Sequence, residues 1–218
     1  MDNIIEKLLA NPIVPVFYHA DVTYAQQVLQ AAYNGGVRVF ELTNRGENAY
    51  EVFLALQTYA QAHCPDLTLG IGTIYNTIEA ERFIDGGAAF IVQPVTTAAV
   101  GEVCERYGVP WIPGAMTPTE IYQATLYGAE IVKVFPGNVL TPGFIKALRG
   151  PMPHVKLLVT NGVEPSTDNL ASWFDAGVNA VGIGSALFSG GTNLPEIENR
   201  FRELMGFIKN HIKSNINT

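Results

Sequence analysis

Residues 130–137 read Glu-Ile-Val-Lys-Val-Phe-Pro-Gly and place one lysine in the middle of an apolar, β-branched run. Such a run is typical of a strand buried on both faces, because parallel strands covered by helices are continuously hydrophobic. Successive side chains of a strand point to opposite faces, so Ile131, Lys133 and Phe135 share one face. An isolated ammonium is costly to bury. Lys133 must therefore be paired, lose its proton or reach a wet cavity.

The pattern of an apolar strand followed by a helix repeats eight times along the chain. Strands are predicted at residues 13–18, 37–43, 67–73, 89–94, 110–115, 130–137, 156–161 and 180–185. Helices are predicted at residues 2–10, 21–34, 49–63, 77–84, 97–107, 141–148, 166–176 and 194–212, with one more opening at 117–120. Eight strand–helix units in series are typical of an α/β fold, the (β/α)₈ TIM barrel.

The alternative to a barrel is a doubly wound open sheet. That fold usually has fewer strands and a glycine-rich first turn, which this sequence lacks. We therefore expect residues 1–218 to form a single (β/α)₈ barrel domain with a short N-terminal helix. Two capping patterns support the helix starts: Asn76 precedes Glu79 by three residues, and Thr117 precedes Pro118 and Glu120.

Composition excludes several classes of protein. The chain has 218 residues, is 48% hydrophobic and carries a net charge of −7, which argues against nucleic acid or anionic membranes as partners. It contains no run of about eighteen apolar residues, so we expect no membrane span, and its N-terminus lacks the organisation of a signal peptide. The two cysteines, Cys64 and Cys104, have no metal-like spacing, and we interpret them as free thiols in the cytoplasm.

In a TIM barrel the active site lies at the carboxyl ends of the strands. In the second predicted strand Val37, Val39 and Glu41 share one face. If the two valines pack inside the barrel, Glu41 is a carboxylate in its mouth, and Arg45 lies just beyond the strand. The third strand ends at Thr73, whose hydroxyl can hold a small ligand.

Lys133 has two equally supported interpretations from the residues alone. It forms a structural ion pair with Glu41 or another carboxylate, or it attacks a carbonyl to form a Schiff base that allows an adjacent carbon–carbon bond to break. At the ordinary pKa of about 10.4, roughly one amine in 2,500 is neutral at pH 7, and burial raises that fraction. Arg45 would lower the pKa further and Glu41 would raise it. The sequence leaves the net direction open.

The residues around Lys133 suggest further roles. Glu41 suits proton transfer near the lysine. Arg45 suits a substrate carboxylate by its charge and fork geometry, although a surface loop arginine is a serious alternative. His19 is a possible base, but a solvated loop histidine is the favoured interpretation. No histidine–carboxylate spacing indicates a metal, and we expect none.

The last two strands end in glycine-containing segments at residues 160–162 and 182–185. These segments are neighbours in a barrel, where the loops after the seventh and eighth strands often hold phosphate through backbone N–H groups. Tight turns that use glycine for backbone reasons are an equally good explanation.

Together and in this order, these motifs resemble the family of 2-keto-3-deoxy-6-phosphogluconate (KDPG) aldolases, also known as 4-hydroxy-2-oxoglutarate aldolases. The resemblance covers most of the chain. Its most specific parts are the lysine in a Lys-x-Phe-Pro strand and the glutamate in a Glu-x-Thr-x-Arg strand end. The matching stretches are residues 14–16, 36–45, 70–73, 113–114 with Thr117 and Glu120, 132–136 and 182–185.

The resemblance implies a class I aldolase, a carbon–carbon lyase that uses a covalent lysine Schiff base and no metal, usually as a homotrimer. It implies that Lys133 is the Schiff-base lysine and Glu41 the acid/base. The substrate-binding residues that it implies are Arg45 and Thr73 for the pyruvate carboxylate, Pro94 and Phe135 as pocket walls, Thr160 for the hydroxylated portion, and Gly162, Gly184 and Ser185, with Asn161 beside them, at the phosphate end.

Two positions depart from the family pattern. Asn161 stands where the family generally has glycine, and Gln93 stands where a small residue usually precedes Pro94. Asparagine tolerates a left-handed backbone, but its side chain would occupy space near the phosphate end. Gln93 would crowd the pocket or supply a new hydrogen bond.

The leading hypothesis is reversible cleavage of a 2-keto-3-deoxy sugar acid, 6-phosphorylated, to pyruvate and an aldehyde such as glyceraldehyde 3-phosphate. One alternative is an aldolase for 4-hydroxy-2-oxoglutarate or an unphosphorylated keto-deoxy acid. The other is a non-catalytic barrel that binds sugar phosphate. The intact set of Lys133, Glu41 and Arg45 weighs against the non-catalytic alternative.

Overall fold

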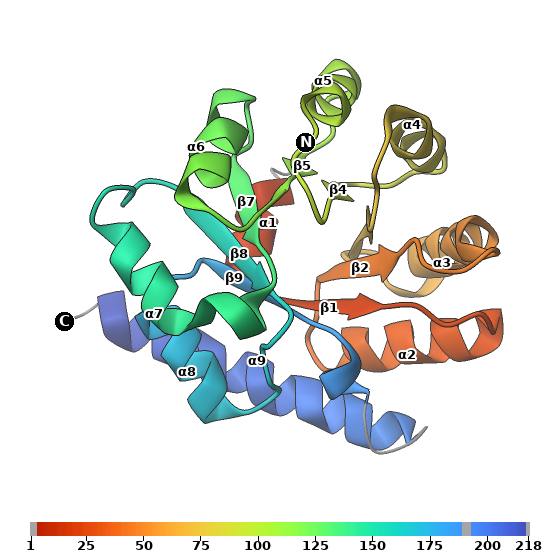
Figure 1. Cartoon of the computed structure of the whole chain (residues 1–218). Coiled ribbons are helices and arrows are strands. Elements are labelled where there is room, and N and C mark those ends of the chain that lie inside the picture. Colours follow the sequence, from red (N-terminus) through yellow and green to blue (C-terminus); the bar gives the residue numbers. More distant parts are fainter. Residues whose placement is uncertain (1–3, 189–192, 217–218) are drawn as a thin grey trace.

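The computed structural model describes residues 4–188 and 193–216 and shows a ring of parallel strands surrounded by helices (Figure 1). The strands are β1 (Ile13–Phe17), β2 (Val39–Thr43), β3 (Thr68–Gly72), β4 (Ile91–Val92), β5 (Trp111–Ile112), β6 (Gly114–Ala115), β7 (Ile131–Val134), β8 (Lys156–Thr160) and β9 (Ala180–Ile183). The helices are α1 (Ile4–Ala10), α2 (Val22–Asn34), α3 (Ala49–His63), α4 (Thr77–Asp85), α5 (Ala98–Tyr107), α6 (Pro118–Leu126), α7 (Gly137–Arg149), α8 (Thr167–Asp175) and α9 (Leu194–Ile216).

The strands follow the order β5-β4-β3-β2-β1-β9-β8-β7-β6, and every pairing is parallel. The ends of this order meet at one short segment, because β5 and β6 flank Pro113. The Pro113 carbonyl accepts a hydrogen bond of 2.8 Å from the N–H of Lys133. The predicted (β/α)₈ barrel is therefore confirmed, with its fifth strand divided in two at a residue that has no N–H to donate.

Most predicted element boundaries agree with the structure to within a few residues. The predicted helix 49–63 matches α3, and Thr117 and Glu120 form the expected reciprocal capping box at the start of α6. The strand predicted at 89–94 is reduced to β4. The helix predicted at 141–148 is the second part of α7, which begins at Gly137 and is interrupted at Thr141, where φ is 54°. Residues 2 and 3 of the first predicted helix lie outside the described residues.

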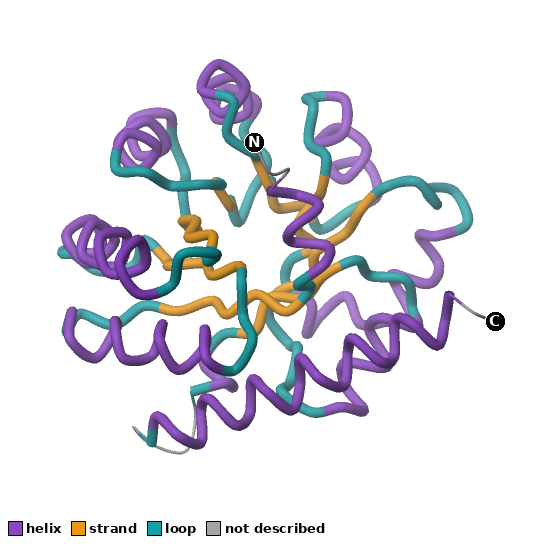
Figure 2. The backbone as a smooth tube through the Cα atoms, turned by 180° about the vertical axis from the view of Figure 1, so that it is seen from behind, coloured by secondary structure: helices purple, strands orange, loops and turns teal. Residues whose placement is uncertain are grey.

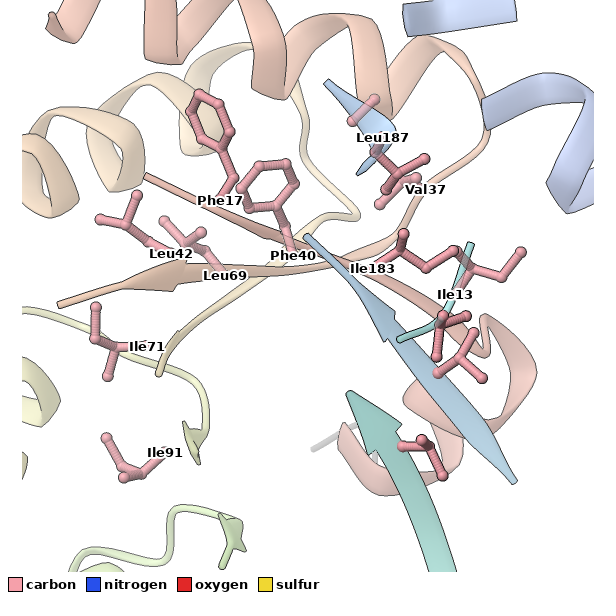
Figure 3. Packing of buried hydrophobic residues seen from close by; sticks show 14 of the residues in the cluster. Ile13, Phe17, Val37, Phe40, Leu42, Leu69, Ile71, Ile91, Ile183 and Leu187 are labelled. Atoms are coloured by element: carbon pink, nitrogen blue, oxygen red, sulfur yellow. The ribbon is translucent and has the colours of Figure 1, made fainter. Parts of the chain in front are cut away.

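Buried apolar side chains form two separate clusters, one between the strands and the outer helices and one inside the barrel. Figure 3 shows part of the outer cluster, in which the Phe17 and Phe40 rings lie 6.2 Å apart in an edge-on arrangement. Val37 belongs to this outer cluster, so the prediction that it packs inside the barrel is wrong. Val37 lies in the turn between α2 and β2, where its N–H donates to the carbonyl of Ala32 in α2. It therefore does not follow the alternation of the strand.

The amino ends of the strands are closed by α1, which crosses the ring when the molecule is seen from behind (Figure 2). Ile5 and Leu8 of this helix are buried in the interior cluster with Val14, Val39 and other strand residues. With α1 over the amino ends, the carboxyl ends of the strands are the ends left for the predicted chemistry. In the described part of the chain, no helix is long and apolar enough to cross a membrane.

Candidate active site

Three buried polar side chains lie at the carboxyl ends of strands on the inner side of the barrel: Glu41 in β2, Lys133 in β7 and Thr160 in β8. Each stands two residues beyond an apolar residue of the interior cluster on the same strand. The two-residue period of a strand therefore directs all three into the barrel mouth. The predicted inward orientation of Glu41 and Lys133 is confirmed.

Lys133 is only 6% exposed, and its Nζ lies 5.3 Å from the centroid of the Phe135 ring. Among the described residues, no carboxylate oxygen lies within 4.0 Å of Lys133 Nζ, the distance that defines an ion pair. Burial lowers the pKa of Lys133; the negative charge of Glu41 opposes this effect and the positive charge of Arg45 adds to it. The net shift of the Lys133 pKa, which the sequence leaves open, is downward and favours the neutral amine.

Glu41 is 1% exposed, and its Oε1 has no hydrogen-bond partner within the described part of the structure. The carboxyl group lies over Gly72 of β3, where an added Cβ would come within 1.8 Å of Oε1. Only glycine leaves room for it there. Burial raises the pKa of Glu41, while the positive charges of Lys133 and Arg45 act in the opposite direction.

The shifts of Lys133 and Glu41 both favour the uncharged form. A structural ion pair would have lowered the pKa of the glutamate and raised that of the lysine. Because no carboxylate oxygen of the described residues lies within 4.0 Å of Lys133 Nζ, the geometry does not support the ion-pair interpretation. A neutral buried amine can attack a carbonyl carbon, and a nearby carboxyl group can donate and accept protons.

Arg45 lies in the exposed loop after β2, close enough to influence the charges of both Glu41 and Lys133. Within residues 4–188 and 193–216 its guanidinium has no ion pair, so it is available to a ligand. The loop is held by Tyr18, whose hydroxyl donates to Asn48 Oδ1 at 2.6 Å and packs where a side chain at Gly46 would stand. Tyr18 was not predicted from the sequence; the glycine directly after Arg45 was the available signal.

Thr73 follows β3 and has a left-handed backbone, with φ of 64°. For a β-branched residue this conformation is unusual and costs on the order of 1–3 kcal/mol. Among the hydrogen bonds of the described residues, none uses the Thr73 N–H or hydroxyl. A strained residue with unused donors beside Glu41 can bind an anionic or carbonyl oxygen.

Gln93 lies on the helix side of β4, fully buried, so of its two predicted effects it does not crowd the pocket but supplies new hydrogen bonds. Ile91 packs in the outer cluster and Val92 in the interior one, and the alternation places Gln93 outside again. Its Oε1 accepts from the Trp111 indole N–H at 2.8 Å, and its Nε2 donates to the Ile74 carbonyl at 3.1 Å. The glutamine therefore takes no space from a substrate.

Two further predicted residues border the mouth. The backbone of Pro94 lies so close to Gly114 that an added Cβ there would come within 2.4 Å of it. Phe135 follows β7 and is half-buried beside the Lys133 ammonium. Their role as pocket walls stays a prediction.

The predicted distal residues lie on the neighbouring strands β8 and β9, which pair through Thr160 and Gly182. Thr160 is 4% exposed, and within the described residues its hydroxyl has no partner. Gly162 has φ of 83°, and an added Cβ would come within 2.4 Å of the Asn138 backbone nitrogen. Gly184 and Ser185 lie beyond β9, where the 3₁₀ turn Ser185–Leu187 begins.

Asn161 lies between Thr160 and Gly162 with φ of 65°, and its Nδ2 donates to Asn138 Oδ1 at 3.1 Å. Both asparagine side chains are exposed. The tolerance of asparagine for this conformation, which the sequence suggested, is confirmed. Its amide is tied to the start of α7 rather than directed freely into the mouth.

The remaining candidates are peripheral. His19 is exposed, and its Nδ1 accepts the backbone N–H of Asp21 at 3.1 Å, which fits the favoured interpretation of a loop histidine. In the described part of the chain, no group of three or more histidine, cysteine or acidic residues is arranged to hold a metal ion. Cys64 and Cys104 are free thiols, as predicted, and both are buried.

A buried lysine shifted toward the neutral amine, facing a carboxyl group at the mouth of a (β/α)₈ barrel, defines the class of Schiff-base, or class I, aldolases. Comparison with known proteins agrees. The family model described as KDPG and KHG aldolase matches residues 4–199, and the chain belongs to this family.

The similar proteins include the probable 2-dehydro-3-deoxy-6-phosphogalactonate aldolase of Rhizobium meliloti (strain 1021), 28% identical over 92% of this chain and 92% of that protein. The 2-dehydro-3-deoxy-phosphogluconate aldolase of Treponema pallidum (strain Nichols) is 33% identical over 79% of this chain and 80% of its own length. A solved KDPG aldolase from Legionella pneumophila, with pyruvate captured as a covalent carbinolamine, has a TM-score of 0.82 at 24% identity, covering 90% of this chain and 95% of its own, and shares the fold. The protein is thus an aldolase, and a non-catalytic barrel is the less supported alternative.

Proposed function

We propose that this aldolase reversibly cleaves a 2-keto-3-deoxy sugar acid with a 6-phosphate to pyruvate and an aldehyde such as glyceraldehyde 3-phosphate. The observation that carries the proposal is the burial of the Lys133 amine without an ion-pair partner among the described residues. Burial also raises the pKa of the nearby Glu41 and so favours its uncharged form. A neutral amine is the form that can attack a ketone.

In the proposed reaction, Lys133 Nζ attacks the C2 carbonyl carbon to form a carbinolamine, and loss of water gives an iminium. Glu41 supplies the proton that turns the carbinolamine hydroxyl into water. As the C3–C4 bond breaks, its electron pair moves to C3 and forms an enamine, while Glu41 takes the proton of the C4 hydroxyl and the aldehyde leaves. Protonation at C3 and hydrolysis of the iminium then release pyruvate and restore the amine.

The remaining residues position the substrate in this proposal. The Arg45 guanidinium and the Thr73 N–H and hydroxyl bind the carboxylate, since none of these three donor groups is used in an ion pair or hydrogen bond of the described residues. Pro94 and Phe135 form the pocket walls. Thr160 bonds a hydroxyl group with its unpartnered Oγ1. The phosphate lies beyond them, at the backbone of Gly162, Gly184 and Ser185 with Asn161 alongside.

A second substrate class follows from one specific observation. The Asn161 side chain, bonded to Asn138, stands next to Gly162 at the proposed phosphate end. It favours a shorter or unphosphorylated substrate, such as 4-hydroxy-2-oxoglutarate or an unphosphorylated keto-deoxy acid. Kinetic comparison of phosphorylated and unphosphorylated keto-deoxy acids separates the two classes.

Trapping with borohydride tests the covalent step. Reduction in the presence of pyruvate should leave one stable adduct on the peptide that contains Lys133. Lys156→Met is the matched control, because this lysine begins the adjacent strand at the closed end of the barrel and its loss should leave the adduct unchanged. If the wild-type protein gives no reduced adduct on Lys133, the aldolase mechanism proposed here is wrong.

We further propose that the chain works as a homotrimer in the cytoplasm. The resemblance to trimeric aldolases supports association, as do exposed apolar side chains such as Val95, Met116 and Tyr122, which a subunit contact would cover. Two free buried thiols fit a reducing compartment. Sedimentation analysis measures the number of subunits directly.

A further inference from the structure

Gln93 connects three segments directly behind the candidate active site. Its side chain is fully buried between β4 and the outer helices. Nε2 donates to the Ile74 carbonyl at 3.1 Å and to the Thr97 hydroxyl at 3.4 Å, while Oε1 accepts from the Trp111 indole N–H at 2.8 Å. A buried amide bonded at both ends is fixed in one orientation.

The carbonyl that Gln93 binds belongs to the residue directly after Thr73. Thr73 has the left-handed φ of 64°, a conformation that a β-branched residue keeps only where its surroundings hold it. The Ile74 N–H reaches the Val92 carbonyl at 3.4 Å, which is long for such a bond. The Gln93 bond is therefore the shorter of the two that hold the backbone after the turn.

We propose that Gln93 is a positioning residue that holds Thr73 in its left-handed conformation and so directs the Thr73 N–H and hydroxyl toward the carboxylate of the keto acid. The inference rests on the proposed function, in which Thr73 binds that carboxylate. Gln93 itself touches no substrate, because it lies on the helix side of the strand.

The inference has a chemical consequence that general destabilisation does not share. Loss of the Gln93 amide should weaken binding of compounds that carry a carboxylate next to the reacting carbonyl. It should leave the reactivity of Lys133 toward a simple ketone unchanged. Pyruvate and acetone differ in this respect, since only pyruvate has the carboxylate.

The experiment measures borohydride trapping on Lys133 as a function of pyruvate or acetone concentration in the wild-type protein and in Gln93→Met. Methionine keeps the length of the side chain and removes both the donors and the acceptor. We expect half-maximal trapping by pyruvate to require a roughly ten-fold higher concentration, as for the loss of one positioned hydrogen bond, and the acetone curve to stay the same. Gln93→Asn, whose amide is one methylene too short to reach Ile74, gives the same result and serves if Gln93→Met does not fold.

Two controls separate positioning from stability. Trp111→Phe removes the indole donor but leaves the Gln93–Ile74 bond, so its pyruvate curve should stay within about two-fold of wild type. Asn179→Ala removes a side chain that accepts the Leu157 N–H at 2.8 Å at the closed end of the barrel, and should lower stability without changing either curve.

An unchanged pyruvate curve in Gln93→Met would overturn the inference, and so would an equal loss with both compounds. If the wild-type protein forms no adduct with either compound, the proposed function itself fails. The two failures are therefore distinguishable.

Discussion

The interior of the barrel has two layers built by the same strands two residues apart, and they differ in chemistry. The lower layer, toward α1, is apolar in three strands whose upper-layer residues are polar: Val39 then Glu41 in β2, Ile131 then Lys133 in β7, and Leu158 then Thr160 in β8. All six side chains are almost completely buried. Burial stabilises the lower layer and opposes the charges of the upper one.

The two layers also differ in how their polar atoms are satisfied. Among the described residues, three buried side-chain atoms lack a hydrogen-bond partner: Glu41 Oε1, Thr160 Oγ1 and Trp173 Nε1. Two of them belong to the upper layer. Each such atom costs about 1–3 kcal/mol. The lower layer therefore stabilises the barrel, whereas the upper layer lowers its stability and provides polar groups that can bind a substrate.

Removing the lysine should give the largest effect. Lys133→Met should reduce kcat/KM by roughly 10⁴-fold or more, because the covalent intermediate can no longer form. Retro-aldol assays on purified protein measure this loss, and circular dichroism checks that the fold persists. Activity within ten-fold of wild type would show that another residue supplies the nucleophile.

The same substitution should raise stability. The folded-state pKa of Lys133 lies below its ordinary value of 10.5, so the unfolded chain binds more protons between the two values. The ammonium therefore destabilises the fold fully below the folded pKa, and this cost disappears as the pH rises toward 10.5. We expect Lys133→Met to gain about 0.5–2 kcal/mol in free energy of unfolding, with the gain shrinking at high pH. Denaturant titrations across this range measure it; a loss of stability would contradict the comparison.

Truncating a side chain of the lower layer should lower stability and leave activity largely unchanged, the opposite of the result expected for Lys133→Met. Leu158→Ala should cost about 2–5 kcal/mol of unfolding free energy through lost burial and a cavity, while the folded enzyme keeps most of its kcat. Thr160→Val, two residues along the same strand, is the matched control. It removes an unpartnered hydroxyl, so stability should hold or rise while KM increases. Equal stability losses at the two positions would remove the distinction between the layers.

Much of the architecture follows from local patterns in the sequence. Continuous apolar strands, repeated helices and the Thr117–Glu120 cap predict the barrel, and two-residue alternation places Lys133 and Glu41 in its mouth. The positions of proline and glycine predict most boundaries of the helices and strands. The division of the fifth strand at Pro113 was not predicted, because it depends on which partners each half finds.

The failures concern residues whose orientation depends on neighbours distant in sequence. Gln93 lies on the same side as Ile91, toward the helices, where its Oε1 accepts the indole N–H of Trp111. Val37 is drawn outward by the turn after α2. The pKa of Lys133 shifts in a direction set by three effects: burial and Arg45 lower it, and Glu41 raises it. Their balance depends on distances in the folded structure. Adjacent residues in sequence carry no information about that balance.

The smallest predicted effect lies at the edge of the upper layer, at Asn161. Asn161→Gly removes a side chain at the proposed phosphate end and suits the left-handed backbone, where φ is 65°. We expect the ratio of kcat/KM for phosphorylated over unphosphorylated keto-deoxy acids to rise about three- to ten-fold, a change of roughly 1 kcal/mol in relative binding. Parallel kinetics on the two substrates measure the ratio.

Thr141→Gly provides the matched control for Asn161→Gly, because Thr141 is another non-glycine residue with positive φ, at the interruption of α7. Both substitutions place glycine on a backbone with positive φ, and Thr141→Gly should relieve the larger strain, because asparagine tolerates this conformation better than a β-branched residue. Only Asn161→Gly removes atoms beside Gly162, so only it should change the substrate ratio. A shift of the same size in both variants would mean that backbone strain, rather than the Asn161 amide, governs which substrate the upper layer accepts.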